Sequence, residues 1–235
     1  MNFRKRSYQK EMLDRDDIPF PEIERNMHEL NFINKHLGGH SITLEGFRKV
    51  LSFVPSSKKE ITVCEIGCGG GDNLRVIDDW RKKNNLNCRL IGIDINPDCI
   101  EFAKKTSGEM PAQWIAADYK KVMFDEEPDI VFNSLFCHHF SEEELENVFR
   151  WMKENSSTGF FINDLQRNPM AYYSIKILTR LFSKSRLVKN DAPLSVLRGF
   201  SRYELDQRLR ESGINNFSID WKWAFRWLVV SRSHE

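Results

Sequence analysis

The segment Ile61-Thr62-Val63-Cys64-Glu65-Ile66, followed by Gly67-Cys68-Gly69-Gly70-Gly71, decides the fold of this chain. The first six residues form an apolar, partly β-branched run, which predicts a short buried strand. The glycines that follow predict a sharp turn into a helix, which we expect from Asp72 to about Lys83. Backbone without side chains can approach a ligand closely and direct amide groups toward it. The sequence therefore predicts a ligand site at the end of this strand.

Strands and helices alternate at short spacing after this turn. Further strands are predicted at 89–94, about 113–117, 128–133 and 159–164, with helices over about 97–106 and from Ser141 to about Lys153. This alternation implies parallel strands joined by right-handed crossovers, with ligands bound at the carboxyl ends of the strands.

The two ends of the chain complete an α/β fold. Residues 22–54 have apolar side chains at three- and four-residue spacing, which predicts two helices broken at Gly38-Gly39. Near the other end, a helix is predicted from Ser201 to about Glu211. The last two strands, near 214–221 and 223–231, lie too close together for a crossover and predict a hairpin. We expect a helical tail or lid over 1–57 and one main domain over 58–235.

The composition is typical of a single domain, and its near-zero net charge does not favour binding to a highly charged partner. Of the 235 residues, 40% are hydrophobic, which is enough for one sizeable core. The 35 basic residues nearly balance the 34 acidic ones, so the charge of the whole chain gives no sequence-independent attraction for nucleic acid or for an anionic membrane. We therefore expect no nucleic-acid partner and a small-molecule substrate.

The cysteines and the chain's opening residues bear on location. The five cysteines are odd in number and lack metal-type spacing, which predicts reduced thiols, no metal site and a cytoplasmic protein. The basic opening residues lead into no apolar stretch of the secretory type. No segment approaches the roughly 20 apolar residues of a membrane span.

The glycine turn distinguishes between two cofactor classes. A dinucleotide-binding turn would place its third glycine at position 72, but the residue there is Asp72, next to where a pyrophosphate would lie. The segment instead resembles the first motif of class I S-adenosylmethionine-dependent methyltransferases, ExGxGxG, through Glu65, Gly67, Gly69 and Gly71, with Cys68 inside it. This resemblance implies a Rossmann-like sheet of seven mostly parallel strands, helices on both faces, a C-terminal antiparallel hairpin and S-adenosylmethionine as the cofactor.

Later segments extend the resemblance to about residues 58–231. Asp94 matches the family's acidic residue that binds the ribose hydroxyls, and Ala117-Asp118 resembles its adenine-edge motif. The resemblance also implies that Ile95 and Tyr119 sandwich the base and that the backbone near Asn133 holds the methionine end. An alternative role for both aspartates is ordinary helix capping after strands.

The pair His138-His139 follows the fourth strand and is the candidate catalytic group. An imidazole with a pKa near 6.5 suits removal of a hydroxyl proton at neutral pH, and we favour His139. Either histidine could instead cap the next helix or pack against Phe140. If the acceptor arrives ionised, no base is needed and both histidines only shape the pocket. Asp164 ends the fifth strand, where it could orient the acceptor or form a capping or salt-bridge contact.

An insertion over about 165–200 is expected to determine substrate choice. Residues 165–202 contain eight basic residues and one acid, Asp191, and residues 170–184 predict a basic amphipathic helix. Its apolar stripe either completes the core or lines a tunnel for an aromatic or lipid-like acceptor, with Tyr172, Tyr173 and Arg198 as candidate contacts. Peripheral membrane contact through this helix is a weaker version of the tunnel hypothesis.

The main hypothesis is therefore O-methylation of a small acceptor. Two alternatives stay open at this point: a nicotinamide-dependent reductase on a similar sheet, and a non-catalytic domain that binds S-adenosylmethionine to regulate a partner. The sequence does not determine the acceptor, whether oxygen, nitrogen or carbon is methylated, or the oligomeric state.

Overall fold

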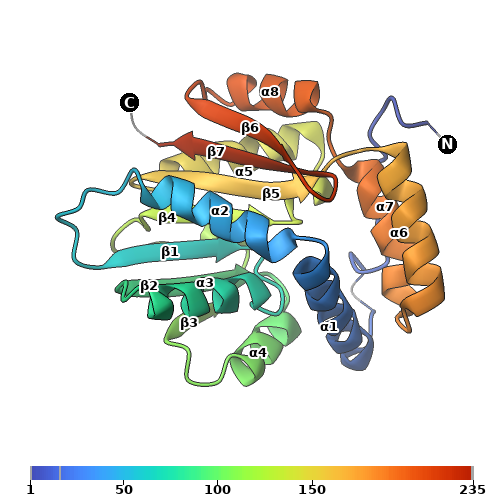
Figure 1. Ribbon diagram of the computed structural model, residues 1–235, viewed down its shortest axis with the longest axis horizontal. Coiled ribbons are helices and arrows are strands. Elements are labelled where there is room, and N and C mark those ends of the chain that lie inside the picture. Colours follow the sequence, from blue (N-terminus) through green and yellow to red (C-terminus); the bar gives the residue numbers. More distant parts are fainter. Residues whose placement is uncertain (1, 16, 234–235) are drawn as a thin grey trace.

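A single seven-stranded sheet forms the centre of the protein (Figure 1). The computed structural model describes residues 2–15 and 17–233. The sheet order is β3-β2-β1-β4-β5-β7-β6. The strands are β1 (Ile61–Ile66), β2 (Cys88–Asp94), β3 (Ala112–Ala116), β4 (Ile130–Ser134), β5 (Gly159–Leu165), β6 (Phe217–Lys222) and β7 (Arg226–Arg232).

The pairing of the strands confirms the predicted fold class. Strands β1 to β5 pair in parallel, whereas β7 pairs antiparallel with both β5 and β6. The predicted final hairpin is thus confirmed, although β6 begins at Phe217 instead of near 214. Ile214 is still tied to the preceding helix, because its amide donates to the carbonyl of Leu209 at 3.0 Å.

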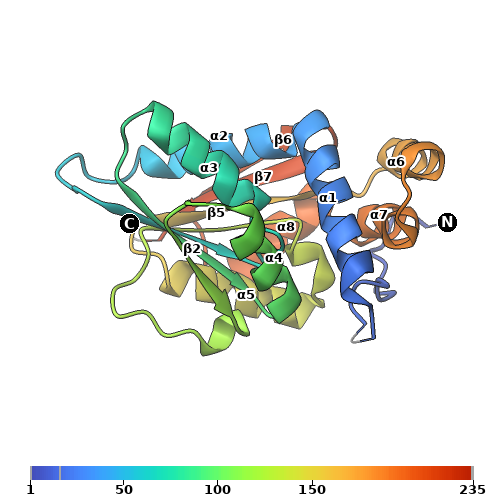
Figure 2. The same ribbon diagram turned by 90° about the horizontal axis from the view of Figure 1, so that it is seen from below.

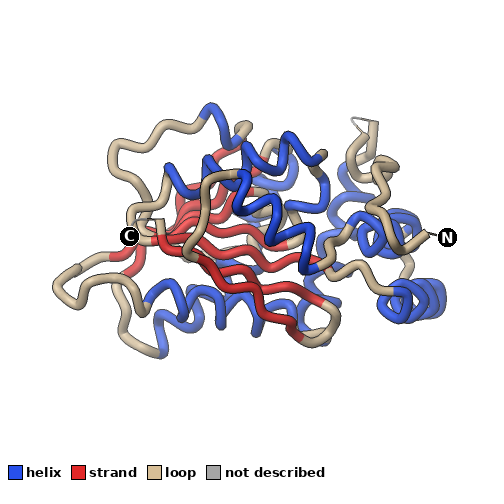
Figure 3. The backbone as a smooth tube through the Cα atoms, turned by 90° about the horizontal axis from the view of Figure 1, so that it is seen from above, coloured by secondary structure: helices blue, strands red, loops and turns tan. Residues whose placement is uncertain are grey.

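Helices cover both faces of the sheet (Figure 3). Side chains of α2 and α3 pack on one face, and those of α5 and α8 pack on the other. The helices are α1 (Phe20–His36), α2 (Gly39–Leu51), α3 (Asp72–Lys83), α4 (Pro97–Thr106), α5 (Glu142–Glu154), α6 (Pro169–Phe182), α7 (Arg186–Arg198) and α8 (Arg202–Glu211), with short 3-10 helices at Tyr119–Lys121 and Cys137–His139. The predicted starts of α5 and α8 are confirmed, since Ser141 and Ser201 each form a capping box with the glutamate three residues later.

Three helices lie beyond the carboxyl ends of the parallel strands. Figures 1 and 2 show α1, α6 and α7 grouped at this end of the molecule, away from the two faces of the sheet. Helices α6 and α7 form the predicted insertion and pack against each other. This arrangement places a second wall opposite the glycine turn. No helix within the described ranges is both long and apolar enough to cross a bilayer.

The outer side of α6 is exposed, which contradicts the expectation that the apolar stripe of this helix completes the core. The apolar stripe of Met170, Tyr173, Ile177 and Leu181 does not complete the core, since each of these side chains is more than half exposed. The buried positions of the helix are Ala171, Tyr172 and Thr179. The reason is geometric: α6 lies at the edge of the molecule, where α7 covers only one of its sides.

The core on the α2 and α3 face contains two stacked aromatic rings. Phe132 in β4 and Phe161 in β5 are fully buried, and their ring centroids lie 4.7 Å apart at an interplanar angle of 7°. Gly46 of α2 lies directly over Phe161, because a Cβ atom there would be only 2.4 Å from the ring. This contact allows α2 to approach the sheet closely.

Replacing Phe161 with alanine should therefore create a cavity beneath α2. We expect the free energy of unfolding to fall by about 3–5 kcal/mol, the range for truncation of a buried aromatic side chain. Chemical denaturation followed by circular dichroism measures this change. Met123→Ala is the control, since Met123 is 91% exposed and should change the free energy of unfolding by less than about 0.5 kcal/mol. Equal stability of F161A and the control would contradict this packing.

Candidate active site

A cavity of about 1290 Å³ opens at the carboxyl ends of the strands. One wall is the glycine turn with the ends of β2 and β4, and the opposite wall comes from α1, α6 and α7. The 3-10 helix with the two histidines and the 223–226 turn also line it. Ligand sites at this edge are the rule for open α/β sheets.

The glycine turn has a backbone that other residues would not tolerate. Gly67 and Gly71 have φ of +67° and +73°, in the left-handed region. A Cβ at Gly67 would lie 2.2 Å from the Phe136 ring, and one at Gly71 would lie 2.4 Å from the Trp114 ring. By contrast, no heavy atom lies within 4 Å of a Cβ built at Gly69. The turn therefore presents open, bare backbone to the cavity at Gly69.

Asp94 lies at the end of β2 and faces this turn. Its carboxylate accepts hydrogen bonds from the amides of Gly69 at 2.8 Å and Asn96 at 2.9 Å. The carboxylate lines the cavity and keeps lone pairs for further donors. Asp94 thus couples the glycine turn to the start of α4, in the position expected for a sugar-binding residue.

The next loop places Ile95, Ala117, Asp118 and Tyr119 on the cavity wall. The amide of Ala117 is already donated to the carbonyl of Asp94 at 2.9 Å, so it is not free to bind a base. Asp118 caps the following 3-10 helix by accepting from the amide of Lys120. Ile95 is 74% exposed, whereas the ring of Tyr119 is buried and its hydroxyl has no hydrogen-bond partner.

Behind the turn, Glu65 is fully buried. One carboxylate oxygen accepts from Asn73 at 2.9 Å, while the other has no partner. Burial, reinforced by the charge of Asp72, raises the pKa of Glu65 well above its ordinary value. Glu65 does not itself line the cavity, and we infer that it supports the turn from below.

At the end of β4, the side chain of Asn133 points away from the cavity. Its amide donates to the sulfur of Met152, and its carbonyl oxygen accepts from the thiol of Cys137. Ser134 lines the cavity instead, with a buried hydroxyl that has no partner. Leu135 follows with a φ of 54°, a conformation that is uncommon for leucine and is typical of functional loops.

The two histidines are each held by a carboxylate. Nδ1 of His138 lies 2.7 Å from Asp164, whose other oxygen accepts from the His138 amide. Nδ1 of His139 lies 3.0 Å from Asp14. Both histidines line the cavity, but the side chain of His138 is almost fully buried, whereas that of His139 is 24% exposed. His139 is therefore the more accessible of the two.

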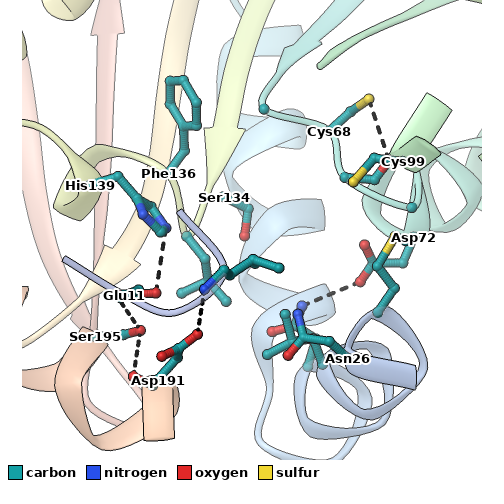
Figure 4. Close-up of a pocket in the computed structure, with 18 of the residues that line it drawn as sticks. Glu11, Asn26, Cys68, Asp72, Cys99, Ser134, Phe136, His139, Asp191 and Ser195 are labelled. Carbon is teal, nitrogen blue, oxygen red and sulfur yellow. Dashed lines mark hydrogen bonds and ion pairs between the residues drawn. The ribbon is translucent and has the colours of Figure 1, made fainter. Parts of the chain in front are cut away.

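Residues 2–15 form a strap that closes this side of the cavity. From it, Glu11 lies between the histidines, with its oxygens 3.6 Å from Nε2 of His138 and 3.9 Å from Nε2 of His139. Figure 4 shows Glu11 between His139 and Ser195. Glu11 is 4% exposed, and it accepts a hydrogen bond from Ser195 at 2.8 Å.

Helix α7 holds the strap in place. Asp191 accepts from the amides of Met12 and Leu13 at 2.8 and 3.0 Å. Arg198 donates to the carbonyls of His138, His139 and Gln9. Arg198 is 5% exposed and does not line the cavity, so the structure gives it a bracing contact with the backbone instead of the substrate contact that we expected.

The strap also changes the acid–base properties of His139. Burial alone would lower the pKa of His139, but the hydrogen bond to Asp14 and the charges of Glu11 and Asp14 outweigh it and raise the pKa above 6.5. For Asp14, burial is likewise outweighed by the interaction with His139, and its pKa is lowered. The pair therefore stabilises the imidazolium that forms when His139 takes up a proton.

Glu11, His138 and His139 are also the residues that could hold a metal ion, since their ligand atoms lie within 4.8 Å of one another. However, Glu11 already accepts from Ser195, and Nε of Arg198 lies 3.8 Å from it. The guanidinium of Arg198 thus already compensates the charge of this carboxylate.

The remaining substrate candidates lie outside the cavity lining. Tyr172 is buried against Phe3, and Tyr173 is 54% exposed on the outer side of α6. The cavity face of the insertion consists of other side chains: Ala171, Ser174, Ile175 and Leu178 of α6, and Val188, Asp191, Ala192, Ser195 and Val196 of α7. Asp164 is fully buried and holds His138.

Comparisons with known proteins agree with this geometry. Residues 63–159 match the family model described as methyltransferase domain. This segment is a methyltransferase domain. The malonyl-[acyl-carrier protein] O-methyltransferase of Anoxybacillus flavithermus is 33% identical over 73 residues, which cover 31% of this chain and 27% of the relative. The match thus spans about a quarter of the curated relative's length.

Solved structures share the methyltransferase fold. Human N-acetylserotonin methyltransferase in complex with S-adenosylmethionine superposes with a TM-score of 0.62 at 17% identity, covering 91% of this chain and 56% of that one. The plantazolicin methyltransferase BpumL gives 0.61 at 20% identity, with 85% and 79% covered. The magnesium protoporphyrin IX methyltransferase of Synechocystis PCC 6803 gives 0.56 at 10% identity, with 85% and 81% covered.

The residues of the methyltransferase domain fit S-adenosylmethionine, the cofactor of the family. The bare backbone at Gly69 and the carboxylate of Asp94 suit an adenosine, and the unpartnered hydroxyl of Ser134 is available to the amino-acid end. Four further residues of the cavity were not predicted from the sequence: Ser134, the strap residues Glu11 and Asp14, and Arg226. Ser134 directly follows Asn133, which was predicted, whereas only proximity in space marks the other three residues.

Proposed function

We propose that the protein transfers a methyl group from S-adenosylmethionine to the hydroxyl group of a small aromatic or lipid-like acceptor. The observation that carries this proposal is the composition of one cavity. It has the glycine turn and Asp94 on one side and, on the other, a histidine oriented by a carboxylate and an apolar wall from α6 and α7. The curated relative is an O-methyltransferase and the human neighbour is a methyltransferase that acts on a small molecule, and both support methyl transfer as the reaction.

The chain's residues have distinct roles in this proposal. When bound, S-adenosylmethionine would supply an electrophilic methyl group on a cationic sulfur, so that the acceptor oxygen can attack the methyl carbon in line while S-adenosylhomocysteine leaves as a neutral thioether. Asp14 engages Nδ1 of His139, which leaves Nε2 to take the proton of the acceptor hydroxyl, and Asp14 and Glu11 stabilise the resulting imidazolium. His138, locked by Asp164, positions the loop through its backbone contacts with Arg198.

The exposed stripe of α6 supports the proposal that the acceptor is amphiphilic and that the enzyme takes it up at a lipid surface. Of the thirteen large hydrophobic side chains that are exposed in the described residues, six belong to this one helix. Lys176, Arg180 and Lys184 lie beside them and are exposed, without an ion-pair partner among the described residues. An apolar stripe flanked by cations is typical of helices that lie on anionic membranes. On the other side of α6, Ile175 and Leu178 line the cavity.

The role of Asp94 is tested by Asp94→Asn. This change keeps the shape of the side chain but removes the charge that accepts from the ribose hydroxyls. We expect the affinity for S-adenosylhomocysteine to fall about ten- to a hundredfold, consistent with ~1.5–3 kcal/mol for hydrogen bonds to a charged group. Calorimetry measures it, with Glu101→Gln on the exposed side of α4 as the control. Unchanged affinity in D94N would refute the ribose assignment.

The Asp14–His139 pair is tested by the titration of His139. The Asp14 interaction raises the pKa of His139, so Asp14→Asn should move the midpoint of its titration to lower pH than in the wild type. Histidine NMR resonances followed against pH measure this shift without any acceptor. Asp17→Asn is the control, since Asp17 is exposed and contacts Arg15. A midpoint that stays in place in D14N would show that the strap does not tune His139.

The lipid-surface proposal is tested by vesicle flotation. We expect binding to phosphatidylcholine vesicles that contain about one-third phosphatidylserine, and weak binding to pure phosphatidylcholine. The triple variant Ile177→Ser, Leu181→Ser, Phe182→Ser should lose most of the binding, because it removes three side chains that are 58–76% exposed. Met123→Ser, on a distant loop, should bind like the wild type. Equal flotation of the triple variant and the wild type would contradict the proposal.

A further inference from the structure

Arg226 brings a buried positive charge to the cavity. It is the first residue of β7, it is 3% exposed, and it lines the cavity next to the 223–225 turn. Nothing in the proposed methyl transfer uses this side chain so far. A guanidinium has five N–H donors in a planar fork, which suits two-point binding of a carboxylate.

The partners of Arg226 are neutral. Nη2 donates to the amide oxygen of Asn34 at 2.8 Å, and Nη1 donates to that of Asn163 at 3.4 Å. No carboxylate of the described ranges 2–15 and 17–233 lies within 4.0 Å of it. Of the other buried arginines, Arg167 and Arg198 have acidic partners, whereas Arg6 donates to the backbone carbonyls of Arg198, His138 and Phe140 and does not line the cavity.

The acids nearest to Arg226 are already committed to other groups. Asp72 pairs with His40 at 2.9 Å, and Asp164 pairs with His138 at 2.7 Å. Burial lowers the pKa of Arg226 to about 10, against the charges of Asp164 and Asp72, so the side chain remains charged at neutral pH. A buried charge without a close counter-ion is costly, and a bound anion would relieve that cost.

Arg226 lies between the two halves of the cavity. Toward the cofactor half, its partner Asn34 donates to Asp72, the first residue after the glycine turn. Toward the acceptor half, its partner Asn163 precedes Asp164, which holds the histidine loop. A carboxylate at the junction of these halves would therefore reach the guanidinium.

We propose that Arg226 is a carboxylate-binding residue of this cavity, which takes either the carboxylate of the amino-acid end of the cofactor or a carboxylate on the acceptor. The proposal rests on the proposed function, since it uses the same cavity. It adds a charge requirement: a ligand at this junction is anionic. The two asparagines that flank Arg226 fix the direction of its fork without neutralising it.

Calorimetry with two compounds related to the cofactor tests whether Arg226 binds the carboxylate of the cofactor's amino-acid end. S-adenosylhomocysteine has the amino acid, whereas 5′-methylthioadenosine has the same adenosine and sulfur without it. We expect Arg226→Gln to bind S-adenosylhomocysteine at least tenfold more weakly than the wild type and 5′-methylthioadenosine equally well. Arg226→Lys keeps the charge but not the planar fork, so its affinity for S-adenosylhomocysteine should lie between those of the wild type and of Arg226→Gln. Failure of the wild type to bind either compound would instead remove the proposed function itself.

Thermal shift in the presence of saturating S-adenosylhomocysteine tests whether Arg226 binds a carboxylate on the acceptor. The probes are 4-hydroxybenzoate and its uncharged methyl ester. A loss of the 4-hydroxybenzoate effect in R226Q with the ester effect retained assigns the carboxylate to the acceptor. Equal weakening of both cofactor-related compounds in R226Q would mean a merely structural arginine and overturn the proposal. So would unchanged S-adenosylhomocysteine affinity with no carboxylate-selective loss in the second arm.

Discussion

The cavity depends on the reversal of strand order on the two sides of β1. Strand β2 lies on one side of β1 and β4 lies on the other, so the connections that leave β1 and β4 run to opposite faces of the sheet. A crevice must open between connections that diverge in this way. The glycine turn, Asp94, Ser134 and the two histidines all follow strands that end at this crevice.

The pairing of charges around the crevice determines which of its charged groups remain without a counter-ion. Acidic side chains are paired with histidines on both sides of it: Asp72 with His40, Asp164 with His138 and Asp14 with His139. Because these acids are engaged, the guanidinium of Arg226 is left with amide partners only. Arg198 holds the strap in a similar way. It donates to backbone carbonyls of the strap and of the histidine loop, and it keeps Glu11 and Asp14 near the histidines.

Local patterns predicted the sheet well, because each signal lies within one turn or strand end. The run 61–71 was sufficient for β1, its turn and α3, and Asp94 followed from its place after β2. The acceptor half was harder to predict. Helical periodicity does not say which side of α6 meets a neighbour, so Tyr172 and Tyr173 were expected in the cavity where Ile175 and Leu178 lie. Glu11 and Arg226 come together with distant residues only through tertiary packing.

The cavity joins residues from nearly the whole length of the chain, since the Arg226 side chain binds Asn34, 192 positions away. Such a site forms late, because loop-closure entropy delays contacts between distant segments. Occupancy of the cavity and cooperative folding are then thermodynamically linked, so a ligand that binds only the native state protects both ends of the chain at once. Damage at either end would accordingly weaken ligand binding even where the glycine turn itself is intact.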